Sequence, residues 1–254
     1  MELRVLGADG GIGDHRGTTS LQISPRALID AGTGLETLEL EAMLGIERVY
    51  LSHAHLDHTA CLPLLVDAQF AELVAQGRQL EIVALPEVIQ ALHQHLFNGT
   101  IWPDFSRLPD PAAPVLRFTP LSPWQEQPLP GDAPGSLMAF PVPHGTVACG
   151  FRLRDAQGRQ TVFTGDTTLD DSLVEALDAL GDIDLMLLEC SFPDRLTSLA
   201  RLTGHMTPTL VATLLARMAR PPQRLWLGHM KPGYRLTIQQ ELSTVLRGRQ
   251  WRCL

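Results

Sequence analysis

The strongest constraint on the fold of this chain is a cluster of histidines in Ser52–His58, which has the sequence SHAHLDH. The cluster directly follows Arg48–Leu51, an apolar segment that is expected to be a buried strand. A lone buried histidine needs only one hydrogen bond, but three histidines and an aspartate together would carry a large desolvation cost. A metal ion removes that cost because it takes imidazole and carboxylate lone pairs as ligands. The cluster therefore predicts a metal site at the end of a buried strand.

The spacing inside the cluster predicts two metal positions. In an extended strand end, the side chains of His53 and His55 point the same way. Asp57 and His58 fall at the start of a helix, where they can face a second position. The cluster can thus supply two ligands to each of two metals, and the remaining ligands must come from other parts of the chain.

Three further candidate ligands each follow a predicted strand. They are His144 after Phe140–Pro143, Asp166 after Thr161–Gly165 and His229 after Leu225–Gly228. Ligands on loops that follow buried strands suit a rigid, concave site. The full candidate set has seven members: His53, His55, Asp57, His58, His144, Asp166 and His229.

The order of strands and helices predicts two sheets that helices cover on their outer faces. Strands are expected at Leu3–Leu6, Leu21–Ile23, Ala27–Asp30, Arg48–Ser52, Leu80–Ala84, Met138–Val142, Thr146–Arg152, Gln160–Thr164, Ile183–Glu189 and Arg224–Gly228. Helices are expected at Leu35–Leu44, Leu62–Gln76, Pro86–Phe97, Leu173–Leu180, Pro208–Arg220 and Leu236–Arg247. With 254 residues, 44% of them hydrophobic, we expect one domain over residues 1–254. The Pro-, Asp- and Ser-rich segment 103–135 is expected to be a surface excursion.

The net charge and the cysteine content limit which partners and which cellular compartment are expected. The net charge of −8 argues against stable binding of a long nucleic acid but allows a small anionic substrate. The four cysteines form no CxxC pair, which favours reduced thiols. The N-terminus does not resemble a signal peptide, and no apolar run approaches the ~20 residues of a membrane span. We therefore expect a soluble, cytoplasmic protein with no membrane partner.

These motifs together resemble the metallo-β-lactamase superfamily over essentially the whole chain. The resemblance is carried by HAHLDH, His144, Gly165-Asp166-Thr167 and Gly228-His229. It implies an α/β (α+β) fold, a four-layer αββα sandwich with a dinuclear site on one edge. It also implies His53, His55 and His144 on one metal, Asp57, His58 and His229 on the other, and Asp166 between them. Zinc is the expected metal, with manganese or iron as alternatives. For Asp30, a place behind the ligands or in a turn is expected.

Three segments resemble the class II cyclic-nucleotide phosphodiesterases of that superfamily: FNGTIWP from Phe97, ECSFP from Glu189 and GHMTP from Gly204. The resemblance implies hydrolysis of 3′,5′-cyclic AMP or GMP to the 5′-monophosphate. It implies catalytic roles for Asp57, for His205 as general acid or phosphate donor, and for Glu189, which would orient His205. Substrate contacts are expected from Asn98, Trp102 and Ser191.

Other functions remain open at this point. They are a tRNA 3′-processing type of endonuclease, an ester, lactone or thioester hydrolase, and a metal-binding module without activity. Because members of the superfamily often form dimers, a homodimer is expected. His15, His93 and His95 have no assigned role, and Lys231 either steers phosphate or is solvated.

Overall fold

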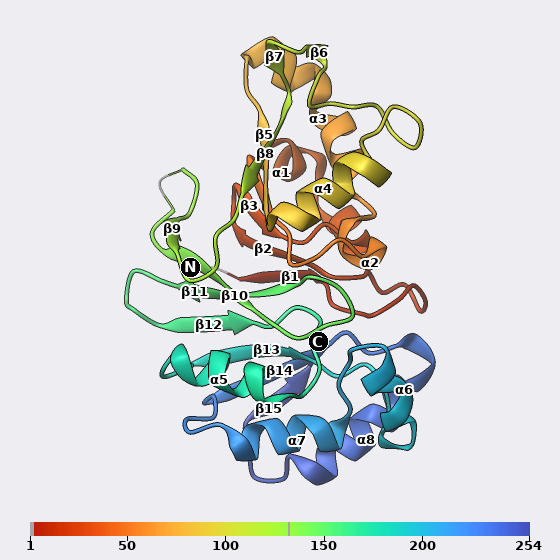
Figure 1. Ribbon diagram of the computed structural model, residues 1–254, viewed down its shortest axis with the longest axis vertical. Helices are drawn as coiled ribbons and strands as arrows, with labels where there is room; N and C mark the ends of the chain where they lie inside the picture. The colour runs from red at the N-terminus through yellow and green to blue at the C-terminus, as the bar shows by residue number, and fades with distance from the viewer. Residues whose placement is uncertain (1–2, 132) are drawn as a thin grey trace. The chain divides into compact units, whose positions relative to one another are not determined.

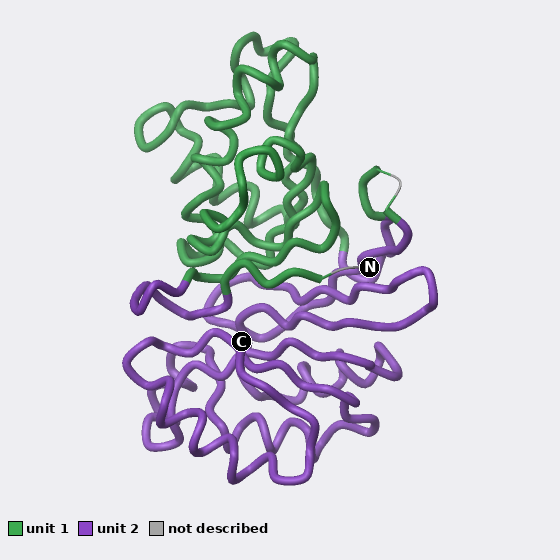
Figure 2. The backbone as a smooth tube through the Cα atoms, turned by 180° about the vertical axis from the view of Figure 1, so that it is seen from behind, with its two compact units in different colours: residues 1–7, 17–122, 129–133 green, residues 8–16, 123–128, 134–254 purple. Residues whose placement is uncertain are grey.

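The computed structural model describes residues 3–131 and 133–254. The chain forms two compact units, drawn as a ribbon in Figure 1 and coloured by unit in Figure 2. Unit 1 consists of residues 1–7, 17–122 and 129–133, and unit 2 consists of residues 8–16, 123–128 and 134–254. Each unit has its own sheet and its own helices. A single domain over 1–254 stays a prediction.

Unit 1 contains a six-stranded mixed sheet in the order β1-β2-β3-β4-β5-β8. Its strands are β1 (Arg4–Gly7), β2 (Ser20–Ser24), β3 (Ala27–Ile29), β4 (Arg48–Tyr50), β5 (Leu80–Ala84) and β8 (Leu116–Pro120). The first three strands pair antiparallel, and β3, β4, β5 and β8 pair parallel. All five residues of β5 are buried, as expected for a parallel strand that is covered on both faces.

The described part of unit 1 has five short to medium-length helices. They are η1 (Thr33–Thr37), α1 (Leu40–Leu44), α2 (Leu56–Thr59), α3 (Leu62–Gln76) and α4 (Pro86–His95). Helix α3 has a proline in its first turn and ends at Gly77, which is left-handed with φ of 60°. Both the predicted helix Leu62–Gln76 and the predicted strand Leu80–Ala84 have the predicted bounds.

Unit 2 contains a seven-stranded sheet in the order β15-β14-β13-β12-β11-β10-β9. Its strands are β9 (Glu126–Pro128), β10 (Ser136–Pro141), β11 (Cys149–Arg154), β12 (Gln160–Phe163), β13 (Leu185–Glu189), β14 (Arg224–Gly228) and β15 (Trp251–Cys253). Strands β12 to β15 pair parallel and the others pair antiparallel. The carboxyl ends of β12, β13 and β14 therefore lie at one edge of this sheet.

Helices cover the seven-stranded sheet and form the core of unit 2. They are α5 (Asp171–Ala179), η2 (Asp194–Leu196), α6 (Thr197–Leu202), α7 (Pro208–Arg217), η3 (Pro232–Tyr234) and α8 (Arg235–Val245). Figure 1 shows α5, α7 and α8 against one face of the sheet. Leu177, Leu214 and Leu242 from these three helices are fully buried with Met186 and Leu227 from the strands. Burial of this apolar surface fixes the strands that carry the candidate ligands.

Two expectations need correction. The predicted helix Leu35–Leu44 is two short helices, η1 and α1, because Leu38 and Glu39 have extended backbone. The segment 103–135 is more than a surface excursion, since it contains β6 (Pro109–Asp110), β7 (Ala113–Pro114), β8 and β9. Strand β8 closes the sheet of unit 1 and β9 closes that of unit 2. Prolines lie at the ends of these strands, and edge strands tolerate proline. The composition of the segment therefore resembles that of a loop.

No helix in the described part of the chain is long and apolar enough to span a bilayer.

Candidate metal centre

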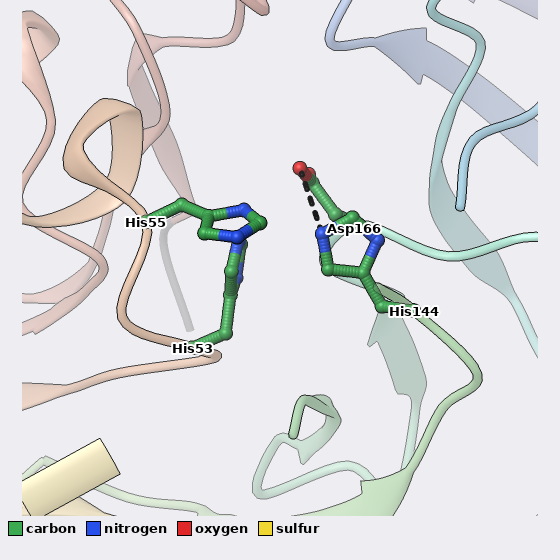
Figure 3. Close-up of side chains that lie close together, drawn as sticks. All are labelled: His53, His55, His144 and Asp166. Atoms are coloured by element: carbon green, nitrogen blue, oxygen red, sulfur yellow. Dashed lines mark ion pairs between the residues drawn. The ribbon is translucent and has the colours of Figure 1, made fainter. Parts of the chain in front are cut away.

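In unit 1, the candidate ligands follow β4 directly. The chain leaves β4 at Tyr50, stays extended through His55, and turns into α2 with His55 as its N-cap (φ −63°, ψ 148°). The rings of His53 and His55 have centroids 4.6 Å apart and lie nearly perpendicular (Figure 3). Ligand atoms of His53 and His55 lie within 4.8 Å of one another, as do those of Asp57 and His58. The rings of His53 and His58 are also close, with centroids 4.2 Å apart, and the division of the cluster into two pairs stays a prediction.

Asp30 lies behind two of these histidines. It follows β3 directly and is fully buried, and its backbone φ is 58°. Its Oδ1 accepts a hydrogen bond from the Ser52 amide at 2.8 Å. Its Oδ2 lies 2.7 Å from His58 Nδ1 and accepts from Ser52 Oγ at 2.8 Å. Because the only hydroxyl proton of Ser52 goes to Asp30, Ser52 Oγ accepts from His53 Nδ1 at 3.0 Å. Both imidazoles are thereby left with Nε2 as the metal-binding atom.

In unit 2, two of the candidate ligands lie at the carboxyl ends of parallel strands, and His144 follows the antiparallel strand β10. Asp166 follows β12 and His229 follows β14. Asp166 Oδ1 lies 3.1 Å from His229 Nε2. Its other oxygen, Oδ2, lies 3.9 Å from Nε2 of His144 (Figure 3). One carboxylate therefore presents different oxygens to two histidines, which is the arrangement a bridging ligand requires.

The protonation state of His144 also suits a ligand. Its Nδ1 donates to the carbonyl of Gly204 at 2.9 Å, which leaves the Nε2 lone pair toward Asp166. Burial lowers the pKa of His144 and keeps the imidazole neutral, the form that binds a metal.

Glu189, at the end of β13, organises a second group of side chains. Its Oε1 lies 2.7 Å from His205 Nδ1 and accepts from the Thr167 amide at 2.9 Å. Its Oε2 accepts from Ser191 Oγ at 2.7 Å. Since that hydroxyl proton is used, Ser191 Oγ accepts from His229 Nδ1 at 3.0 Å. Glu189 therefore holds His205 directly and His229 through Ser191.

The environment of His205 favours its charged form. Burial alone would lower the pKa of His205, but the charge of Glu189 and its hydrogen bond outweigh burial and raise that pKa above its ordinary value. With Nδ1 held by Glu189, Nε2 carries the proton that can be transferred. The predicted pairing of Glu189 and His205 is thus present.

The donor set fits divalent metal ions. Nδ1 of five histidines faces a carboxylate, serine or carbonyl oxygen, so that each presents Nε2. Such partners fix the tautomer and orientation of metal-binding histidines. Imidazole and carboxylate donors together suit zinc, manganese and iron.

The predicted substrate residues have other contacts. Asn98 is exposed, but its Oδ1 accepts from the amides of Thr100 and Ile101, both at 2.9 Å, so it closes its own turn. Ser191 is fully buried, its Oγ donates to Glu189, and its role as a direct substrate contact stays a prediction. The buried indole nitrogen of Trp102 has no hydrogen-bond partner in the described structure. Roles for Asn98 and Trp102 stay predictions.

Of the residues left unassigned, His15 is exposed and the ring of His93 packs on Phe118 at 4.3 Å. Lys231 is not simply solvated, because its Nζ donates to the carbonyl of Gly10 at 2.7 Å. Sequence analysis gave no role to Ser52, although its place next to the first histidine was a usable signal.

Comparison with known proteins identifies the family. The family model described as "Beta-lactamase superfamily domain" matches residues 25–230. The chain is 28% identical over 200 residues to 3′,5′-cyclic-nucleotide phosphodiesterase 1 of Saccharomyces cerevisiae. That alignment covers 70% of this chain but only 52%, about half, of the yeast protein.

Solved structures show the same fold. Unliganded yeast PDE1 matches with a TM-score of 0.81 and 20% identity, over 99% of this chain and 96% of that one. The metallo-β-lactamase fold protein YhfI from Bacillus subtilis matches with a TM-score of 0.72 and 21% identity, over 99% and 95%. The short form of human tRNase Z matches with a TM-score of 0.64 and 20% identity, over 100% and 96%. These neighbours confirm the predicted fold class. Because the family model covers most of its length, the chain belongs to the beta-lactamase superfamily, and its fold is the metallo-β-lactamase fold.

Proposed function

We propose that this chain is a metal-dependent phosphodiesterase that hydrolyses a small phosphodiester, with 3′,5′-cyclic AMP or GMP as the substrate to test first. The observation that carries the proposal is the buried Glu189–His205 pair at 2.7 Å, because it provides a proton donor of raised pKa. The sequence similarity to a yeast cyclic-nucleotide phosphodiesterase supports the same substrate class.

We also propose that the chain holds two divalent ions, with zinc as the first metal to test. Within unit 1 the candidate ligands form two pairs, and within unit 2 Asp166 is common to two pairs. The resemblance to the superfamily implies one position with His53, His55 and His144 and another with Asp57, His58 and His229, with Asp166 at both. Bound there, the ions would activate water and neutralise charge on the phosphoryl oxygens.

The residues of the chain have distinct tasks in this reaction. Water attacks phosphorus and the bond from phosphorus to the 3′-oxygen breaks, so the leaving oxygen needs a proton. His205 donates that proton from Nε2, and Glu189 keeps the ring oriented through Nδ1. Asp57 is proposed to hold a metal ion next to the attacking water. The product of a 3′,5′-cyclic nucleotide is then the 5′-monophosphate.

A small substrate is favoured over tRNA because the chain carries a net charge of −8. The likeness to tRNase Z is one of fold at 20% identity. An ester or lactone hydrolase would use the same metal position, and the similarity to a yeast cyclic-nucleotide phosphodiesterase favours the phosphodiester over these substrates.

Phosphorus NMR of the zinc- or manganese-loaded protein with cyclic AMP tests the proposal. We expect a 5′-AMP signal that Asp166→Ala abolishes. The matched control is Asp182→Ala, because the side chain of Asp182 is 80% exposed. If the loaded protein binds two metals but leaves cyclic AMP and cyclic GMP intact, the cyclic-nucleotide proposal is wrong. Cleavage of tRNA at comparable rates would favour the endonuclease.

A further inference from the structure

The backbone of His229 has a conformation that its own sequence does not favour. Its φ is 58°, in the left-handed region that residues other than glycine rarely adopt. The amide of His229 donates to the carbonyl of Ala8 at 2.5 Å. Ala8 begins the segment 8–16, which connects β1 to β2 and belongs to unit 2. The conformation of a candidate ligand is thus tied to a segment more than 200 residues away in the sequence.

Gly10 also lies directly against His229. A Cβ atom at Gly10 would lie 2.5 Å from the His229 carbonyl oxygen and 2.7 Å from its Nδ1. The amide of Gly10 donates to Met230 O at 3.1 Å, and its carbonyl accepts from Lys231 Nζ at 2.7 Å. The segment therefore packs against the His229 loop at van der Waals distance. A side chain at position 10 would not fit between them.

Asp9 anchors the segment to the helical layer. It is 2% exposed, and its Oδ1 lies 2.8 Å from Nη1 of Arg235, the first residue of α8. Arg16 approaches the same oxygen at 3.9 Å. Asp9 and Met230 also form an isolated parallel β-bridge. An ion pair this deeply buried contributes little net stability because desolvation offsets its attraction. Its main effect is to fix where the segment lies.

We infer that Asp9 and Gly10 are positioning residues for His229. By fixing the segment against the loop, they keep His229 Nδ1 on Ser191 and its Nε2 on Asp166. The metal position that includes His229 would then depend on them, although neither residue is a ligand. The metal part of this inference rests on the proposed function, whereas the backbone part does not.

Amide hydrogen exchange in the metal-free protein tests the backbone part. In Asp9→Asn, the His229 amide should exchange about tenfold faster or more, because the ion pair that holds the segment to Arg235 is lost. The matched control is Asp155→Asn. Asp155 is also buried and pairs with an arginine, Arg159, at 2.7 Å, but in a hairpin turn. Unchanged exchange at His229, or a general loss of protection throughout unit 2, would overturn the inference.

Cobalt(II) titration followed by visible absorption tests the metal part. Gly10→Ala should lower the occupancy of one of two cobalt positions and leave the other intact. Gly233→Ala is the control, since a Cβ at Gly233 meets nothing within 4 Å. Two cobalt ions bound to Gly10→Ala with unchanged affinity would overturn the positioning role. If the unsubstituted protein itself binds fewer than two ions, the proposed dinuclear centre fails, and the amide exchange still decides the backbone part.

Discussion

Asp30 in unit 1 and Glu189 in unit 2 orient their histidines through the same arrangement of hydrogen bonds. Each is a buried carboxylate that follows a strand, and each holds one imidazole directly, at 2.7 Å in both cases. Each also accepts the hydroxyl proton of a serine, Ser52 or Ser191, whose oxygen then accepts from a second imidazole. Because the serine lies between the carboxylate and the second imidazole, that imidazole donates to a neutral hydroxyl oxygen. Only the first imidazole of each pair contacts the carboxylate directly. In unit 2, this difference suits a division between a proton donor, His205, and a metal ligand, His229.

The serines should therefore matter for metal affinity. Ser52→Ala and Ser191→Ala remove the acceptors for Nδ1 of His53 and His229 and free both tautomers. We expect each substitution to weaken metal binding about 10- to 100-fold. Competition with a chromophoric zinc chelator measures this. Ser243→Ala is the control, because Ser243 is exposed on α8. Equal affinities in all three variants would contradict the role of the two hydroxyls.

The Glu189–His205 pair predicts the alkaline limb of the pH–rate profile. His205 must be protonated to donate, so kcat should fall as the pH rises through its raised pKa. In Glu189→Gln the attraction is lost while burial remains, so the pKa of His205 should drop and the limb should move to lower pH. Imidazole NMR titration of the metal-free protein checks the same shift without turnover. An alkaline limb at the same pH in both proteins would remove His205 as the acid.

The same pair predicts how stability depends on pH. A histidine whose pKa is raised by folding contributes stability that is fully present below its ordinary value of 6.5. That contribution disappears as the pH rises through the folded pKa. Urea unfolding of the metal-free protein and of His205→Gln should thus show a difference that is larger at pH 6 than above the folded pKa. A difference that grows with pH would reverse the assigned sign.

Much of the site could be predicted because its ligands follow strands. His53, His144, Asp166 and His229 each come at or just after a strand end, and parallel strands bring their carboxyl ends to one edge of a sheet. The spacing within Ser52–His58 also predicts how its ligands divide into two pairs. Local sequence is sufficient there because the chemistry is concentrated in a few residues.

The residues that support the ligands could not be predicted in the same way. Asp9 and Gly10 lie in a glycine-rich turn whose sequence indicates only conformational freedom, and their partners Arg235 and His229 lie at the other end of the chain. Such contacts depend on tertiary structure, which no local pattern specifies. Strand β8 was missed for a related reason, since pairing with β5 outweighs its proline-rich surroundings.

The core of unit 2 predicts a large effect of a single truncation. Leu214 on α7 is fully buried in the apolar cluster between helices and sheet. Leu214→Ala should lower the free energy of unfolding by about 2–5 kcal/mol, from lost apolar burial and the cavity left behind. Leu202→Ala is the matched control, because Leu202 is 82% exposed. Similar urea midpoints for the two variants would show that α7 does not pack as described.

Metal removal should lower stability because the unfolded chain does not hold the candidate ligands in a binding arrangement. A ligand that binds only the folded state stabilises it by about 4 kcal/mol when its free concentration is about 1,000 times Kd. Treatment with a chelator should therefore lower Tm, and zinc should restore it. In Asp166→Ala we expect a much smaller zinc-dependent shift, since both proposed positions lose a shared ligand. Differential scanning fluorimetry with and without zinc measures both shifts. An undiminished shift in Asp166→Ala would mean that zinc stabilises the protein from another site, and Asp166 would lose its proposed place between two ions.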